Sequence, residues 1–110
     1  MTREDFRSAL IAFTRLTEIQ PNFAEAWNRR ATLFYLLGEF SLSISDIKRT
    51  LELEPRHFGA ISGLGQILMR QNKLQEAREA FAKALEVNPH LSGARLNILQ
   101  INKMLSENSI

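Results

Sequence analysis

The sequence predicts an all-α fold built from repeated helical hairpins. The first observation behind this prediction is a period of 34 residues, at which Pro21, Pro55 and Pro89 recur. The second is that apolar residues within each period recur at steps of three and four, which is the spacing of one helix face. The third is that Gly38 and Asn72 occupy the same place in successive periods, where a helix can end in the left-handed conformation. Such a repeat determines the architecture of the whole chain.

Six helices are expected from these signals. Each proline ends a helix because it lacks an amide hydrogen and crowds the preceding turn. At the start of the chain, Thr2 and Asp5 form a capping pair for the first helix. The expected helices lie near residues 2–19, 22–37, 40–53, 57–71, 74–87 and 91–106.

Three further classes of residue recur in the same register as the prolines. One class is small, one is aromatic or branched, and one is a large apolar residue at or near the start of a helix. Their members are, in turn, Ala9, Ser43 and Ala77, then Phe13, Ile47 and Phe81, then Phe6, Phe40 and Leu74. Agreement of several classes at one period indicates that each unit is a helix–turn–helix.

At these positions the chain resembles the tetratricopeptide repeat (TPR) family, whose unit is a helical hairpin of about 34 residues. Residues 24–57 match its pattern through Trp27, Ala31, Phe34, Gly38, Phe40, Ser43, Ile47, Leu51 and Pro55. Residues 58–91 match through Leu64, Gly65, Leu68, Ala77, Phe81, Ala84, Leu85 and Pro89. The resemblance covers nearly the whole chain, and it is to short bacterial TPR proteins or fragments.

The resemblance implies one TPR domain over residues 1–110, a solenoid of about six antiparallel helices in a right-handed superhelical array. Residues 2–21 are expected to be a half-repeat, the second helix of a hairpin. The two full repeats, 24–57 and 58–91, follow. Residues 92–106 are expected to be a terminal or capping helix.

In TPR arrays the first helices of the hairpins line a concave groove that binds peptides or helices of partner proteins. The resemblance therefore implies a non-catalytic scaffold with a protein or peptide partner. The side chains that it places toward the groove are Asn28, Thr32, Tyr35, Ser62, Gln66, Met69 and Arg70.

Some TPR domains hold the terminal carboxylate of chaperone tails with Lys, Asn and Arg side chains. In this chain Asn28 and Thr32 stand where the first Lys and Asn of that clamp would be, and Gly63 replaces its next Asn. These residues cannot supply the charge-assisted hydrogen bonds that carboxylate capture needs. A chaperone-tail partner is therefore not expected.

The first expected helix is apolar over more than half of its circumference, which is typical of a helix buried on two sides. In a TPR array one of those sides would meet the helix's own hairpin partner. We expect this face either to mediate homo-oligomerisation, for instance as a homodimer, or to dock on an upstream helix absent from these 110 residues. The candidate residues are Phe6, Ala9, Leu10 and Phe13.

Three glycines, Gly59, Gly63 and Gly65, fall within one expected helix, where each costs roughly 1 kcal/mol relative to Ala. The family resemblance explains Gly65, because the two helices of a hairpin approach closely at that point. Two explanations remain open for the other two: a flat patch that a partner backbone approaches, or a locally loose helix.

Composition excludes several other functions. The chain has no cysteine and two histidines, both in inter-repeat turns, so disulfides, thiolate chemistry and a Ser-His-Asp triad are not expected. We expect no enzyme activity, no metal and no cofactor. No apolar run approaches a membrane span of about 18 residues, so no membrane partner is expected. The compartment stays open between cytoplasm and, if a signal peptide is removed, periplasm.

A net charge of +2 is too small to indicate a polyanionic partner. A basic strip for RNA is a minor alternative, since some helical-repeat families bind RNA. Its residues would be Arg15, Arg29, Arg30, Lys48 and Arg49. Acidic residues are interspersed among them, whereas nucleic-acid binders usually gather basic residues on one face. We therefore expect no nucleic-acid partner.

Overall fold

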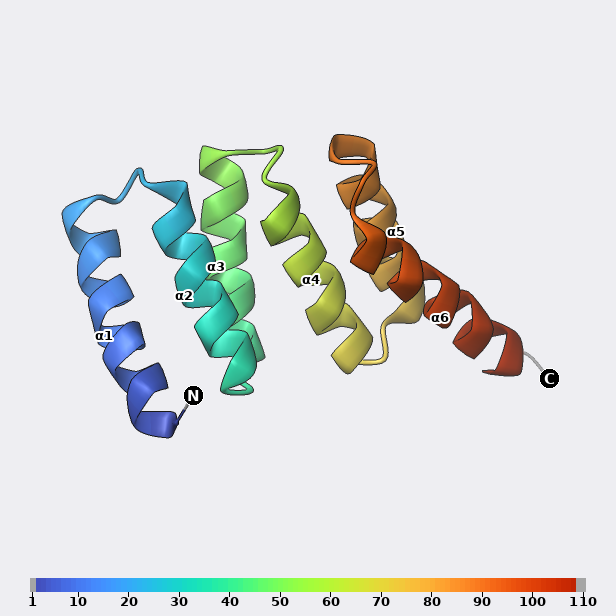
Figure 1. The fold of residues 1–110 in the computed structure, drawn as a ribbon, viewed down its shortest axis with the longest axis horizontal. Helices are drawn as coiled ribbons and strands as arrows, with labels where there is room; N and C mark the ends of the chain where they lie inside the picture. The colour runs from blue at the N-terminus through green and yellow to red at the C-terminus, as the bar shows by residue number, and fades with distance from the viewer. Residues whose placement is uncertain (1, 109–110) are drawn as a thin grey trace. The chain divides into compact units, whose positions relative to one another are not determined.

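The computed structural model describes residues 2–108, which contain six α-helices and no strand (Figure 1). The helices are α1 (Arg3–Ile19), α2 (Ala24–Leu36), α3 (Phe40–Leu53), α4 (Phe58–Arg70), α5 (Leu74–Val87) and α6 (Ser92–Asn108). The prediction of an all-α fold is confirmed. The helices group into two compact units, one with α1 to α3 and one with α4 to α6, divided between His57 and Phe58. This division coincides with the boundary between the two expected full repeats.

The start of α1 is closed by the expected capping pair. The hydroxyl oxygen of Thr2 accepts a hydrogen bond from the Asp5 amide at 3.3 Å, and the Asp5 carboxylate accepts one from the Thr2 amide at 3.0 Å. These bonds to Thr2 lower the pKa of Asp5, because they favour its charged form. Two otherwise unsatisfied groups at the helix start are thereby paired.

The prolines end the second helices as expected. Gln20, Glu54 and Asn88 each precede a proline, and each donates its amide to the carbonyl four residues earlier while leaving the helical conformation. The last helical residue thus lies two positions before the proline, whose ring could not continue the helix.

The turns within the two hairpins share one geometry. Gly38 has φ of 79° and Asn72 has φ of 60°, both in the left-handed region. Their amides donate to the carbonyls of Tyr35 and Met69, and the next amide in each turn donates five residues back, at 2.8 and 2.9 Å. Each turn therefore closes its helix with the same paired hydrogen bonds of a left-handed cap.

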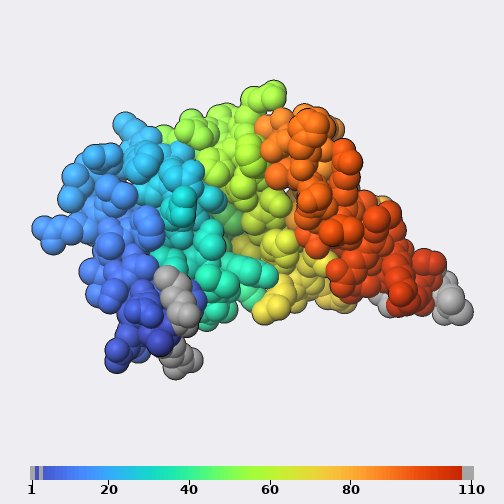
Figure 2. All heavy atoms as spheres, in the orientation of Figure 1, coloured from blue at the N-terminus to red at the C-terminus, as the bar shows by residue number. Residues whose placement is uncertain are grey.

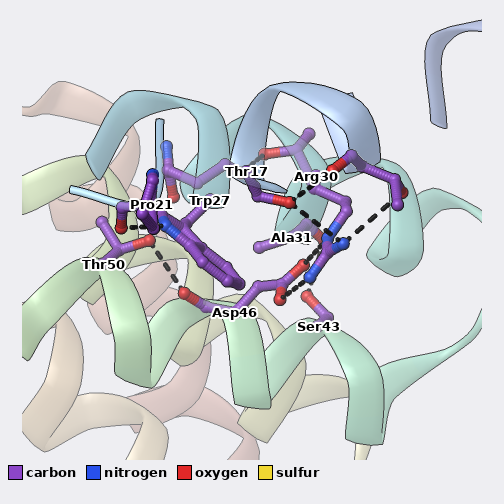
Figure 3. Close-up of polar contacts among 11 residues, drawn as sticks. Thr17, Pro21, Trp27, Arg30, Ala31, Ser43, Asp46 and Thr50 are labelled. Carbon is purple, nitrogen blue, oxygen red and sulfur yellow. Dashed lines mark hydrogen bonds and ion pairs between the residues drawn. The ribbon is translucent and has the colours of Figure 1, made fainter. Parts of the chain in front are cut away.

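In the first unit, α2 and α3 lie antiparallel against each other (Figure 1). The Ser43 hydroxyl donates to the Ala31 carbonyl at 2.7 Å, which brings the two helices close (Figure 3). Ile47 is buried beside them, and the buried Thr50 donates to the Asp46 carbonyl. Both buried hydroxyls at this contact are therefore satisfied within the protein.

In the second unit, α4 and α5 are in close contact at Gly65. A Cβ atom at this position would lie 2.8 Å from the ring of Phe81, which is too close for any real side chain. The expected explanation for Gly65 is confirmed: the glycine makes room for a fully buried aromatic ring. The surrounding core consists of Leu74, Ala77, Phe81, Ala94 and Ile101.

Candidate functional site

The main candidate site is a hollow of about 360 Å³ between α1 and α2 in the first unit. We call it the α1–α2 hollow. Its α1 wall consists of the half-buried, apolar Ala9 and Phe13. Its α2 wall consists of Glu25, Asn28, Arg29, Thr32 and Leu33.

The residues of the α2 wall lie on one helix face because they recur at steps of three and four, and most of them are polar. Arg29 Nε lies 3.2 Å from Glu25 Oε1, and the Thr32 hydroxyl donates to the Asn28 carbonyl at 3.1 Å. These contacts hold the side chains along the helix axis. The hollow therefore has one apolar and one polar wall, an arrangement suited to an amphipathic segment.

Glu25 carries the negative charge of the hollow. Its Oε2 lies 3.3 Å from Nε2 of His57, which follows α3, and Arg29 lies on its other side. Partial burial acts to raise the pKa of Glu25, but the hydrogen bond from His57 and the charges of His57 and Arg29 outweigh it. The pKa therefore falls below its ordinary value, and the carboxylate stays ionised.

The structure places the remaining predicted groove residues outside this hollow. Tyr35 lies near the end of α2, with its ring 5.8 Å from that of Phe40. On α4, Ser62 and Gln66 are half-buried, Met69 packs partly against the core of the second unit, and Arg70 is exposed. Of the seven, Asn28 and Thr32 are brought together with the α1 candidates Ala9 and Phe13.

The other two α1 candidates lie elsewhere on the helix. Phe6 is half-buried, and Leu10 lines a second hollow of about 560 Å³ along α1. This second hollow also contains Ile11 and Ile19, which are 71% and 64% exposed. In Figure 2 the atoms of α1 (blue) form an edge of the first unit, with α2 beside them. Neither isoleucine was among the residues predicted for self-association, although both belong to the apolar surface of the first helix.

The basic strip considered for RNA is largely engaged in internal contacts. Arg30 binds Asp46, and Arg29 binds Glu25. Arg49 lies over the ring of Trp27 and contacts Glu52. Trp27 itself donates its indole N–H to the Pro21 carbonyl at 2.9 Å (Figure 3). The tryptophan is therefore held by contacts within the first unit.

Residues 2–108 contain neither a metal-binding cluster nor a membrane-spanning helix. In this range no group of three or more His, Cys, Asp or Glu residues is placed to hold a metal ion. None of the helices in the same range is long and apolar enough to cross a bilayer.

Two family models, both described as tetratricopeptide repeat, match residues 1–47 and residues 59–91. Together they cover most of both hairpins and agree with the helix register described above. The chain belongs to the TPR family. The TPR fold that the resemblance implied is thereby confirmed.

Curated relatives of this TPR chain come from bacteria and eukaryotes. A TPR repeat-containing protein of Rhizobium etli is 38% identical over 90 residues, which are 82% of this chain and 44% of the relative. The small glutamine-rich tetratricopeptide repeat-containing protein 2 of Mycosarcoma maydis is 29% identical over 99% of this chain and 31% of its own length. The TPR chain thus spans less than half of either relative.

Solved TPR domains share the fold at low sequence identity. The first TPR of Spaghetti (RPAP3), bound to an HSP90 peptide, has a TM-score of 0.88 at 22% identity, over 94% of this chain and 82% of its own. The Sgt2 TPR domain of Aspergillus fumigatus has a TM-score of 0.86 at 18% identity, over 97% and 72%. At these identities the likeness shows the fold alone.

Proposed function

We propose that this TPR chain is a non-catalytic scaffold that binds a peptide or helix of a partner protein. The observation that carries the proposal is the α1–α2 hollow, with an apolar wall from α1 and a polar wall from α2. Asn28 and Thr32 are its contact residues in the first unit. Tyr35 on α2 and Ser62, Gln66, Met69 and Arg70 on α4 remain further candidates.

The relatives support binding of this general kind. The structure of Spaghetti (RPAP3) holds an HSP90 peptide on a TPR domain of the same fold. In this chain Asn28, Thr32 and Gly63 stand where a carboxylate clamp would need Lys and Asn. The proposed partner segment is therefore recognised along its length and not by a terminal carboxylate.

A photo-crosslinking experiment tests the proposal. A benzoylphenylalanine at Thr32, which is exposed on the polar wall, is compared with the same residue at Ser45, which is exposed on α3. We expect adducts with defined peptides of one partner from Thr32 and none of these from Ser45. Identical adducts from both positions, or none from Thr32, would contradict binding in the hollow.

Self-association through α1 is a second candidate, and the exposed Ile11 and Ile19 favour it. Apolar side chains gathered on one surface mark an interface more often than isolated ones do. Sedimentation velocity tests this candidate: a homodimer that Leu10→Asp disperses would support it, and a monomer at all concentrations would exclude it.

A further inference from the structure

The second hollow, which runs along α1, is lined by residues of one side of this helix. They recur in adjacent pairs at every turn, which keeps them on one face. We call this face the outer strip of α1. It is distinct from the wall that α1 gives to the α1–α2 hollow, and it lies on the helix that forms an edge of the first unit (Figure 2). Its members are Leu10, Ile11, Thr14, Arg15, Glu18 and Ile19.

The internal repeat shows that hairpin packing does not cover the centre of the outer strip. Ile11, which is 71% exposed, has Ser45 on α3 and Glu79 on α5 as its counterparts one and two periods later. Both counterparts are exposed, although α3 and α5 each pack against the first helix of their own hairpin. Both counterparts of Glu18 are glutamates and are exposed as well. A helix packed on α1 in the manner of the other hairpins would therefore leave Ile11 exposed.

The outer strip carries one positive and one negative side chain, three residues apart. Arg15 and Glu18 are both exposed, and the salt bridges found within residues 2–108 involve neither of them. Glu18 acts on Arg30 only through its charge. The strip therefore offers a guanidinium group and a carboxylate, each able to form an ion pair with a partner, between apolar residues at its two ends.

We infer that the outer strip packs against the outer strip of a second copy of this chain, with the two α1 helices antiparallel. The positions of the strip are symmetric about the midpoint between Thr14 and Arg15, so a twofold axis through that point maps the strip onto itself. This inference rests on the self-association named above as the second candidate and specifies its surface. It leaves the α1–α2 hollow free for a peptide.

The antiparallel arrangement pairs side chains of matching chemistry. Leu10 of each copy lies opposite Ile19 of the other, and Ile11 lies against the methylene groups of Glu18. Arg15 of each copy comes within one helical turn of Glu18 of the other, which gives two equivalent ion pairs. A parallel arrangement would instead place Arg15 against Arg15 and Glu18 against Glu18. Charge complementarity therefore favours an identical partner in the antiparallel orientation.

The size of this contact determines how strong the association is. The strip covers about three turns of one helix, which is less than the roughly 1,200 Å² of total buried surface that stable interfaces reach. We therefore expect a dissociation constant of about 10–300 µM, so that monomer and dimer exchange over an accessible range of concentration.

Sedimentation equilibrium of the full 110-residue chain, from about 10 µM to about 1 mM, measures this association. Ile11→Arg should weaken it at least about tenfold, because it places two charges in the apolar part of the contact. Ser45→Arg is the matched control, since Ser45 is exposed in the same register on α3. This control should leave the dissociation constant unchanged.

Charge reversal tests the proposed ion pairs. Arg15→Glu and Glu18→Arg should each weaken self-association about tenfold, because each places like charges across the contact. An equimolar mixture of the two variants should form a heterodimer with the affinity of the unsubstituted chain. One copy then carries only carboxylates at these two positions, and the other carries only guanidinium groups.

Disulfide formation tests the orientation, because the chain has no cysteine of its own. In a mixture of Ile11→Cys and Glu18→Cys chains, the antiparallel arrangement brings position 11 of one chain opposite position 18 of the other. Mixed disulfides between the two variants should therefore form faster than disulfides between identical chains.

Each contrary outcome rejects a different part of the inference. A monomer at all concentrations would overturn the inference and self-association together, while the crosslinks from Thr32 would still test the scaffold function. A dimer that is unaffected by Ile11→Arg would keep self-association and reject the outer strip as its surface. Disulfides that form mainly between identical chains would reject the antiparallel orientation, and a mixture of charge variants that stays monomeric would reject the ion pairs.

Discussion

The guanidinium of Arg30 on α2 forms a bidentate ion pair with the carboxylate of Asp46 on α3 (Figure 3). Nε lies 2.8 Å from Oδ2, and Nη2 lies 2.9 Å from Oδ1. The hydrogen bonds to Asp46 raise the pKa of Arg30 against the effect of burial. Arg30 Nη1 also lies 3.4 Å from the hydroxyls of Thr14 and Thr17, so one side chain connects all three helices of the first unit.

Replacing Asp46 by Asn should destabilise the chain strongly. The Asp46 side chain is 5% exposed and that of Arg30 is 16% exposed, so the substitution leaves an arginine charge inside the hairpin without its partner. We expect a loss of about 2–4 kcal/mol in the free energy of unfolding, measured by urea denaturation. Arg30→Lys should cost less, because it keeps the charge and loses only the forked geometry.

Arg29→Lys is the matched control for this pair, because the Arg29 side chain is 64% exposed and its bond to Glu25 lies on the surface. Its effect should stay below about 0.5 kcal/mol. If Asp46→Asn were no more destabilising than this control, the pair would be a surface contact in solution.

Gly65→Ala should destabilise the second unit through overpacking. The added methyl group would lie 2.8 Å from the Phe81 ring, which is 0% exposed. A loss of about 1–3 kcal/mol in unfolding free energy is expected, although Ala is the better helix former.

Gly93→Ala provides the comparison for Gly65→Ala, since nothing lies within 4 Å of the added group. It should raise stability by roughly 0.5 kcal/mol. In a double-mutant cycle, Phe81→Leu should reduce the cost of Gly65→Ala. Strictly additive effects would show that the ring is not what excludes the methyl group.

At the two turn residues with left-handed backbone, Gly38 and Asn72, substitution by Ala should cost more stability than exchange between Gly and Asn. At Gly38, with φ of 79°, Ala should cost about 1–2 kcal/mol, and Asn should cost less. At Asn72, with φ of 60°, Gly should be nearly neutral and Ala destabilising. Thermal unfolding of the four variants checks this order. If Gly38→Ala were as stable as Gly38→Asn, the turn would have changed its conformation.

The hairpins could be predicted from sequence because several local signals agree. Proline spacing, helix periodicity and the pair of Gly38 and Asn72 all indicate the same boundaries, and the observed helices end within two residues of them. The close contact of Gly65 with its hairpin partner was implied by the family resemblance. Local rules suffice where each turn and helix end is determined by its own residues.

The ion pair of Arg30 and Asp46 was not predicted, because charged residues are assigned to the surface unless a partner is known. These residues lie 16 apart in the chain and on different helices. Likewise, the apolar pattern predicted that α1 is buried on two sides, but it could not show which of its residues α2 leaves exposed. The exposure of Ile11 and Ile19 could be determined only from the position of the neighbouring helix.

Glu25→Gln should produce a loss of stability that depends on pH. The folded chain lowers the pKa of Glu25 below its ordinary value of 4.5, with His57 and Arg29 outweighing partial burial. The folded state therefore binds the proton more weakly than the unfolded state does. The resulting stabilisation is complete above the unfolded pKa and is lost as the pH falls through the lower folded pKa.

Urea unfolding of the wild type and Glu25→Gln, at about pH 5.5 and about pH 3, measures this difference. Because the Glu25 side chain is 44% exposed, solvent screening limits the effect to less than about 1 kcal/mol at the higher pH. The gap between the two proteins should shrink toward zero at the lower pH. In a His57→Gln background the gap at the higher pH should already be smaller, since the main hydrogen-bond partner is gone. A gap that widened as the pH fell would mean that Glu25 is favoured in its protonated form, and that burial outweighs His57 and Arg29.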